Sequence, residues 1–263
     1  MLGSFPGGSR ARLARRLWAL TGILVAVALL LPFRFGLLRL GVVVGGLAFW
    51  AGALYFARKR PIPCAALAAV PALALLGVAL LPGLPAEPEA LRSAYLSALR
   101  GYSGSPYLWG GETRLGIDCS GLIRRGMMDA CLREGVRTAN PALLRQAASL
   151  WWFDSSAKAL GEEYRGNTAA LFEARSLNEL DYARLAPGDI AVTASGLHTL
   201  AYLGGRTWIQ ADPEASRVVS VTAPSQTGWF VQGVRLVRWR PLLLSPADVS
   251  APTPPRRGSR APE

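Results

Sequence analysis

Residues 107–123 read YLWGGETRLGIDCSGLI, a glycine-rich segment that leads into the start of a helix. Asp118 is placed to cap that helix, which puts Cys119 in the first turn, where unpaired N–H groups and the helix dipole favour a thiolate. The apolar residues that follow recur every three to four positions as far as Cys131, and Gly135 is expected to end the helix. This segment therefore predicts a helix that carries a thiol at its N-terminus.

The two cysteines of this helix receive different interpretations. A lone Cys on an apolar helix face is usually a small buried hydrophobic residue, and this is our interpretation of Cys131. Cys119 lies at the helix start and is followed by the small residues Ser120 and Gly121, which let a substrate approach closely. We therefore expect Cys119 to be a nucleophile with a pKa well below the value of about 8.5 of a free thiol.

The surrounding sequence predicts helices followed by strands. Leu91, Tyr95 and Leu99 are spaced for one face of a helix that ends near Gly101, and a further helix is expected over residues 141–152. After residue 188 the hydrophobic period changes to two, which is typical of strands. The expected strands cover residues 189–193, 198–203, 207–211, 218–222 and 234–239. Helices followed by antiparallel strands indicate an α+β domain.

Three apolar runs precede this domain, over residues 17–33, 40–56 and 62–81. Each is long enough to cross about 30 Å of hydrocarbon, so we expect three transmembrane helices. A cleaved signal peptide is the weaker interpretation of the first run, because no small-residue cleavage site follows it and a second run begins within seven residues. Pro63 and Pro71 leave open the alternative that the third run is a re-entrant segment.

The basic residues indicate how the three runs are oriented. Seven of them precede the first run or separate the second from the third, whereas only Arg34 and Arg39 lie between the first and the second. Because cytoplasmic loops are richer in Lys and Arg, we expect the amino terminus in the cytoplasm and the chain after residue 84 outside it. The expected organisation is a membrane anchor over residues 1–84, a folded domain over residues 85–240 and a disordered Pro/Arg-rich tail over residues 241–263.

The composition argues against several classes of protein. The formal net charge of +12 divides into +9 in the first 84 residues, which hold no acid, and +3 in the rest, so the basic excess lies between apolar runs and does not indicate nucleic-acid binding. Three Cys and one His are too few for a zinc site, since Cys64 lies in an apolar run. The chain has no phosphate-binding loop and no dinucleotide-binding glycine motif, so no metal or cofactor is expected. Cys119 and Cys131 lie about 18 Å apart along one helix, which is too far for a disulfide.

Several short motifs together resemble the NlpC family of papain-like cell-wall cysteine peptidases. They are YLWGG at residues 107–111, GIDCSGLI at 116–123, PGDI at 187–190, the single His at position 198 and YLG at 202–204. The resemblance extends over residues 90–240 and implies a papain-like α+β domain in which a helix-borne Cys packs on an antiparallel sheet. The interval of 79 residues between Cys119 and His198 is longer than the common family spacing. The excess lies near residues 151–177, for which we expect a packing role.

The resemblance also implies a role for individual residues. Cys119 would be the nucleophile, His198 the base and Gln210, twelve positions after the His, the polar residue that orients it. Gln210, where the family more often has His, would accept the Nδ1–H of His198 and leave Nε2 facing the thiol. Asp212, two residues further along the same strand face, is the reserve candidate for this orienting role. Tyr107 would line the oxyanion site or position the substrate, the alternative being a packing role beside Trp109. The Cys119 N–H would be the main oxyanion donor.

The leading functional hypothesis is a membrane-anchored cysteine hydrolase of amide bonds in peptidoglycan stem peptides, near a γ-D-glutamyl linkage as the resemblance implies. It would lie in the bacterial cytoplasmic membrane with its catalytic domain facing the periplasm or cell exterior, and its partners would be peptidoglycan peptides and the lipid bilayer. A thiol acyltransferase or amidase directed at lipids or other amides is the second hypothesis, although lipid-acting relatives often have the His before the Cys. The third is a catalytically silent cell-wall-binding domain, which the Gln at position 210 keeps open.

Overall fold

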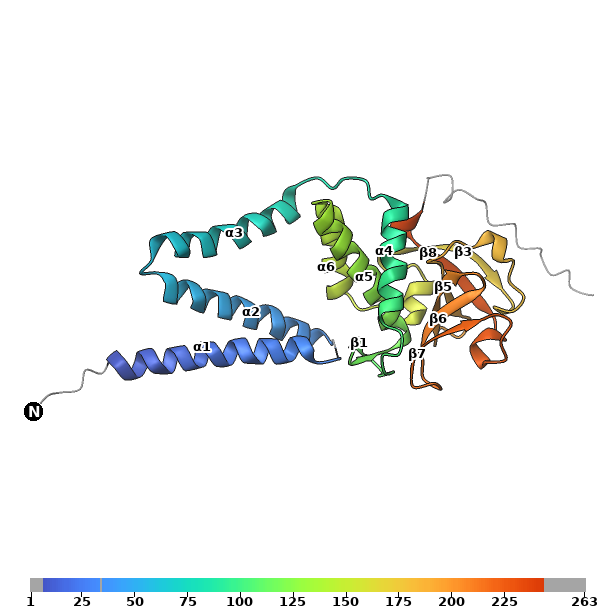
Figure 1. The fold of residues 1–263 in the computed structure, drawn as a ribbon, viewed down its shortest axis with the longest axis horizontal. Helices are drawn as coiled ribbons and strands as arrows, with labels where there is room; N and C mark the ends of the chain where they lie inside the picture. Colours follow the sequence, from blue (N-terminus) through green and yellow to red (C-terminus); the bar gives the residue numbers. More distant parts are fainter. Residues whose placement is uncertain (1–6, 34, 244–263) are drawn as a thin grey trace, which may run out of the picture.

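The structure, a computed structural model, describes residues 7–33 and 35–243 as three long apolar helices followed by an α+β domain (Figure 1). The three helices lie to one side of the domain, and the sheet lies on the side away from them. This is the fold class expected from the sequence, with an antiparallel sheet and a helix that begins at Cys119.

The three apolar runs form α1 (Gly7–Leu30), α2 (Gly36–Ala57) and α3 (Pro61–Leu80). Each helix is long and apolar enough to cross a membrane, with mean hydropathies of 1.8, 1.8 and 2.2. α1 and α2 lie side by side, and the indole of Trp18 stacks on Phe49 with ring centroids 4.9 Å apart. Pro71 lies inside α3 without ending it, so the third run is one continuous helix.

The helices of the domain are α4 (Pro88–Gly101), α5 (Cys119–Arg137), α6 (Pro141–Trp152) and the short α7 (Ala157–Gly161). The apolar face of α5 is buried as expected, and Cys131 is fully buried within it. The helix continues two residues past Gly135, its expected end. Gly135 serves packing instead, because a Cβ at this position would lie 2.8 Å from Cδ2 of Leu144 in α6.

The strands form two sheets. β1 (Glu112–Thr113) and β2 (Gly116–Ile117) form a small hairpin just before α5. The main sheet is antiparallel, in the order β3-β8-β4-β5-β6-β7. Its strands are β3 (Thr168–Ala174), β4 (Ile190–Thr193), β5 (Thr199–Gly204), β6 (Thr207–Asp212), β7 (Arg217–Thr222) and β8 (Val234–Trp239).

Five of the six strands of the main sheet correspond to the expected ones, and β3 is the strand that the sequence did not predict. Its residues TAALFEA do not alternate between apolar and polar, and the register shifts between Ala170 and Phe172. β3 lies in the longer stretch between Cys119 and His198 and pairs with β8 at the edge of the sheet. Part of that stretch therefore extends the sheet.

The domain continues slightly beyond residue 240, where we expected it to end. The 3₁₀ turn η4 (Arg240–Leu242) packs on the domain: Leu242 is buried, and its carbonyl accepts a hydrogen bond from Arg92 at 3.0 Å. The remaining part of the expected disordered tail, residues 244–263, lies outside the described residues. The proposed division between anchor and domain falls in the segment between α3 and α4.

Candidate active site

Cys119 is held at the start of α5 by a cap that uses both carboxylate oxygens of Asp118. Oδ1 accepts the Gly121 N–H at 2.6 Å, and Oδ2 accepts the Gly110 N–H of the preceding loop at 2.8 Å. The loop packs so closely on the helix that a Cβ at Gly121 would lie 2.3 Å from the Gly111 carbonyl oxygen. Position 121 therefore requires glycine, and the cap expected from the sequence sets the position of the thiol.

The Cys119 thiol is almost buried, with 5% of the residue exposed. Its S–H donates to the Leu197 carbonyl at 3.9 Å. Burial, and after it the Asp118 carboxylate, raise the pKa of the thiol to about 12, and hydrogen bonds from the backbone N–H groups of Thr199, Ser120 and Cys119 offset only part of that rise. The expectation of a pKa well below that of a free thiol is therefore wrong for this structure, because desolvation outweighs the helix N-terminus.

His198 lies one residue before β5 and is joined to two side chains of β6. Its Nε2 is 2.7 Å from Oε1 of Gln210, and Nε2 of Gln210 donates to Oδ2 of Asp212 at 3.2 Å. All three residues are buried. The two residues considered as alternative orienters therefore lie in series along one hydrogen-bonded chain.

The hydrogen bonds from Asp212 through Gln210 to His198 determine which nitrogen of the imidazole carries the proton. An ionised Asp212 can only accept, so it holds the amide NH₂ of Gln210 toward itself and Oε1 toward the ring. The neutral ring then carries its proton on Nε2, and Nδ1 is the basic nitrogen. The prediction that Gln210 bonds to Nδ1 and that Nε2 faces the thiol is wrong, because Gln210 lies at the Nε2 edge of the ring.

The surroundings of the imidazole favour its neutral form. Burial lowers the pKa of His198 to about 4, although the hydrogen bond to Gln210 and the charge of Asp212 raise it in part. Trp229, in the turn η3 (Gly228–Phe230), stacks on the ring with centroids 4.1 Å apart and planes at 20°. Trp229 was not predicted as a site residue, because it lies 31 positions after His198 and belongs to none of the motifs.

Tyr107 lies at the same site. Its backbone N–H donates to the Ser216 carbonyl at 2.9 Å, which ties the loop before β1 to the start of β7. Burial raises the pKa of its hydroxyl to about 12, with further contributions from Cys119, Asp118 and Asp212. The hydroxyl is therefore protonated and able to donate a hydrogen bond near the thiol. The structure thus brings the five residues singled out from the sequence to one place.

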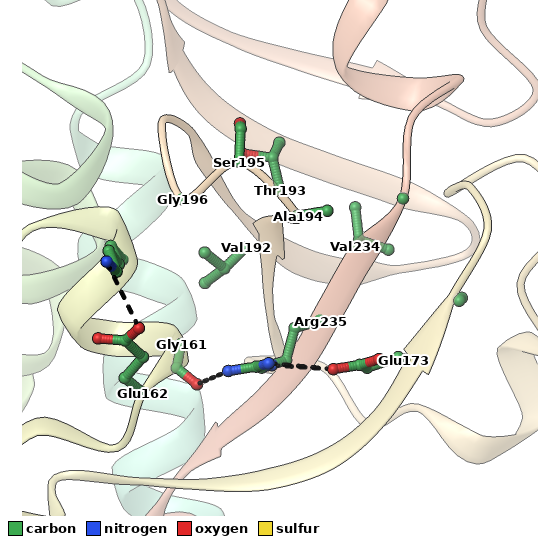
Figure 2. Close-up of a pocket in the computed structure, with 13 residues that line it drawn as sticks. Gly161, Glu162, Glu173, Val192, Thr193, Ala194, Ser195, Gly196, Val234 and Arg235 are labelled. Atoms are coloured by element: carbon green, nitrogen blue, oxygen red, sulfur yellow. Dashed lines mark hydrogen bonds and ion pairs between the residues drawn. The ribbon is translucent and has the colours of Figure 1, made fainter. Parts of the chain in front are cut away.

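A pocket of about 500 Å³ adjoins the loop that leads to His198 (Figure 2). Its walls come from that loop and from α7, β3 and β8. Figure 2 shows Arg235 of β8 reaching the Gly161 carbonyl at 3.3 Å and the Glu173 carboxylate at 3.1 Å, with Ser195 on the opposite wall. Because α7 and β3 belong to the longer stretch after α6, that stretch builds part of a polar pocket next to the site.

Residues 7–33 and 35–243 contain no group of three His, Cys, Asp or Glu side chains placed to hold a metal ion. Cys64, Cys119 and Cys131 are free thiols. The site itself presents a thiol, an imidazole and their hydrogen-bond partners.

A family model described as the NlpC/P60 family matches residues 104–238, just over half of the chain. Similar solved structures include the peptidoglycan hydrolase RipB from Mycobacterium tuberculosis, at 18% identity over 60% of this chain and 69% of that chain, with a TM-score of 0.37. NlpC1 from Trichomonas vaginalis matches at 17% identity over 56% of this chain and 43% of that chain, with a TM-score of 0.36. An NlpC/P60 family protein from Bacillus cereus matches at 17% identity over 60% and 41%, with a TM-score of 0.38. The chain therefore spans less than half the length of the last two, and no curated protein matches it.

Proposed function

The chain belongs to the NlpC/P60 family, and from this premise we propose that it is a cysteine peptidase that hydrolyses amide bonds in peptidoglycan stem peptides, near a γ-D-glutamyl linkage. Members of the family are typically cysteine peptidases or amidases, which supports a cell-wall amidase or peptidase in general. One observation carries the proposal: the Cys119 thiol at the start of α5 contacts Leu197, the neighbour of His198. His198 in turn is hydrogen-bonded to Gln210, and Gln210 to Asp212.

The proposed reaction is acyl transfer through a thioester. His198 Nδ1 takes the proton of the Cys119 thiol as the sulfur attacks the amide carbonyl carbon, and the carbonyl oxygen becomes an oxyanion. The Cys119 N–H and the Tyr107 hydroxyl are the donors available to that oxyanion. The imidazolium gives its proton to the amine nitrogen, which leaves as the C–N bond breaks. A water molecule deprotonated by the imidazole then attacks the thioester, and the carboxylic acid leaves as the proton returns to sulfur.

The proposed location of the domain is outside the cytoplasm, on the side reached after an odd number of crossings. The Glu112 N–H donates to the Pro32 carbonyl, between α1 and α2, at 2.9 Å. Arg145 of α6 donates to the Val78 and Leu81 carbonyls at the end of α3, at 2.5 and 2.9 Å. Contact with the chain both after the first helix and after the third favours three complete crossings over a re-entrant α3, which would return the chain to the side of the basic residues 58–60.

The proposal is tested with the full chain in lipid nanodiscs, because the domain contacts the anchor. Purified muropeptides are incubated with the protein, and the products are identified by mass. We expect hydrolysis that is lost in Cys119→Ala and kept in Cys131→Ala, a matched change of the buried cysteine on the same helix. Cleavage at a bond away from the γ-D-glutamyl residue would contradict the proposed specificity. The absence of any product would favour the catalytically silent binding domain.

A further inference from the structure

The anchor is docked on the hairpin that precedes Cys119. The Glu112 N–H of β1 donates to the Pro32 carbonyl at 2.9 Å, and Phe33 pairs with Gly111 in an antiparallel bridge. Figure 1 shows the connection between α1 and α2 ending next to β1. The hairpin of β1 and β2 is followed directly by the capped start of α5, so the segment that holds the nucleophile also holds the anchor.

Buried ion pairs reinforce this contact. Arg39 of α2, 3% exposed, donates to Oε1 of Glu112 at 2.6 Å and to the Trp152 carbonyl at 3.3 Å. The same Oε1 accepts from Arg124 of α5, which also pairs with Asp154 at 2.8 Å. Because separating charges in a dry environment is unfavourable, the first turn of α2 and the start of α5 keep a fixed relation.

A second attachment joins α3 to α6. Arg145 donates to the Val78 and Leu81 carbonyls, and Nδ2 of Asn140 donates to the Leu84 carbonyl at 2.8 Å. Two attachments to different apolar helices prevent the domain from swinging about a linker. The fold itself therefore sets the distance between the active site and the membrane.

These contacts place the nucleophile close to the surface of the bilayer. Residues 31–33 follow α1 and are the neighbours of β1, and the Asp118 N–H donates to the Gly111 carbonyl at 3.1 Å. One inter-strand spacing of about 4.8 Å separates Phe33 from Gly111, and a second separates Gly111 from Asp118. The backbone next to Cys119 therefore lies about 10 Å from the residues that follow α1. The polar layer on each side of a bilayer is itself about 5–7 Å thick.

Exposed apolar side chains lie on the two segments that meet at the Phe33–Gly111 bridge. Trp109 and Leu115, on either side of β1, are 75% and 66% exposed, and Phe33 and Phe35 of the connecting segment are 42% and 58% exposed. These four residues, which we call the apolar rim, continue the apolar surface of the anchor onto the domain. Aromatic side chains at such a position are typical of the membrane–water interface.

We propose that the active site works at the bilayer surface, with the apolar rim against lipid, and that its substrate is a stem peptide still linked to a membrane lipid. The substrate class rests on the proposed amide hydrolysis, whereas the geometry rests on the anchor contacts. A lipid-linked peptide diffuses in the plane in which the thiol is held. Its effective concentration at the site therefore exceeds that of a free peptide.

The geometry is tested without activity, with a nitroxide at Leu115→Cys in a full chain that also carries Cys64→Ala, Cys119→Ala and Cys131→Ala. The matched control is the same label at Tyr164→Cys. Tyr164 is 43% exposed and precedes β3, at the sheet edge opposite to β7 and the loop of Tyr107. In nanodiscs of phosphatidylethanolamine and phosphatidylglycerol, we expect oxygen to relax the label at position 115 more than a water-soluble nickel chelate does, with the reverse at position 164. A label at position 115 as accessible to nickel as the control would overturn the geometry.

The substrate class is tested with two forms of one γ-D-glutamyl stem peptide, one linked to a palmitoyl chain and one acetylated. In nanodiscs, we expect the wild-type chain to cleave the lipid-linked form at least about tenfold faster at equal total concentration. Leu115→Ser should reduce that ratio, and Tyr164→Ser should not. Equal rates for the two forms would overturn the inference and leave the proposed function intact. Cleavage of neither form would refute the proposed function and the substrate, and the label would still decide the geometry.

Discussion

The amide of Gln210 carries no charge, so its orientation depends on the group beyond it. Its Nε2 donates to Asp212 and its Oε1 lies against Nε2 of His198. When the imidazole takes up a proton, the amide oxygen of Gln210 stabilises the imidazolium only as a dipole. The carboxylate of Asp212 lies one hydrogen bond further away. Gln210 and Asp212 together thus supply the geometry and the charge that a single carboxylate would provide.

We expect Gln210→Ala and Asp212→Asn each to lower kcat at least about tenfold with little change in KM, because the base loses its orientation but substrate contacts remain. Gln210→His should retain activity, since its ring can also accept the Nε2–H. Asp212 acts through Gln210, so the double variant should be no slower than Gln210→Ala alone. Steady-state kinetics of the four variants and the wild type check this. Losses that multiply in the double variant would show that Asp212 acts independently.

The Cys119 thiol is expected to react slowly in the absence of substrate. A pH of 7 is below the thiol pKa of about 12 and above the His198 pKa of about 4, so both groups are neutral at this pH. The rate of labelling by iodoacetamide should then rise about tenfold per pH unit between about pH 6 and pH 9, with no plateau. Labelling followed by peptide mapping measures the rate at Cys119, with the fully buried Cys131 as the slower internal reference. A plateau that begins below pH 7 would instead indicate a thiolate–imidazolium pair in the free enzyme.

Among the elements, those that depend on local signals could be predicted from the sequence. The start of α5 follows from the cap at Asp118, and β4 to β8 follow from a period of two. β3 lacks that alternation, and its place is set by its pairing with β8. The edge of the His198 ring that Gln210 contacts depends on how β6 lies beside β5, which a spacing of twelve residues does not reveal. The contact of Trp229 with that ring is equally non-local.

The pocket beside the β4–β5 loop is expected to bind part of the substrate. Glu173 of β3 is 73% exposed in its side chain and lines the pocket, so Glu173→Gln removes a charge there without removing packing. If Glu173 contacts the substrate equally strongly in the ground state and in the transition state, the KM of Glu173→Gln should rise about three- to tenfold while its kcat stays unchanged. Glu179→Gln, at an exposed acid outside the pocket lining, is the control. Unchanged KM in both variants would show that the pocket does not take part in binding.

At the scale of the whole molecule, composition predicts the anchor but not its docking. Apolar runs are enough to predict the three helices, because lipid acts on every such segment in the same way, and the direction that the basic residues indicate stays a prediction. In the prediction of orientation, Arg39 counts only as a positive charge between the first and the second apolar run. In the structure it is buried against Glu112, 73 positions away, and no local pattern links two residues at that separation.

The energetic link between anchor and domain should be visible in the stability of the full chain. Glu112→Gln leaves the buried Arg39 and Arg124 close together with only Asp154 to compensate them, so we expect a loss of about 3–5 kcal/mol. Arg39→Gln leaves the pair of Glu112 with Arg124 intact and should cost less.

The control for this series is Arg240→Gln in η4, whose ion pair with Glu163 is 46% exposed at the arginine and 39% exposed at the glutamate. Because water screens such a pair, its removal should cost less than about 1 kcal/mol. The three variants and the wild type are compared by thermal unfolding in detergent micelles. A Glu112→Gln midpoint as close to that of the wild type as the Arg240→Gln midpoint would mean that the ion pairs of Glu112 do not couple the anchor to the domain. The fixed distance of Cys119 from the membrane would then rest only on the backbone bond to Pro32 and the contacts of α6 with the end of α3.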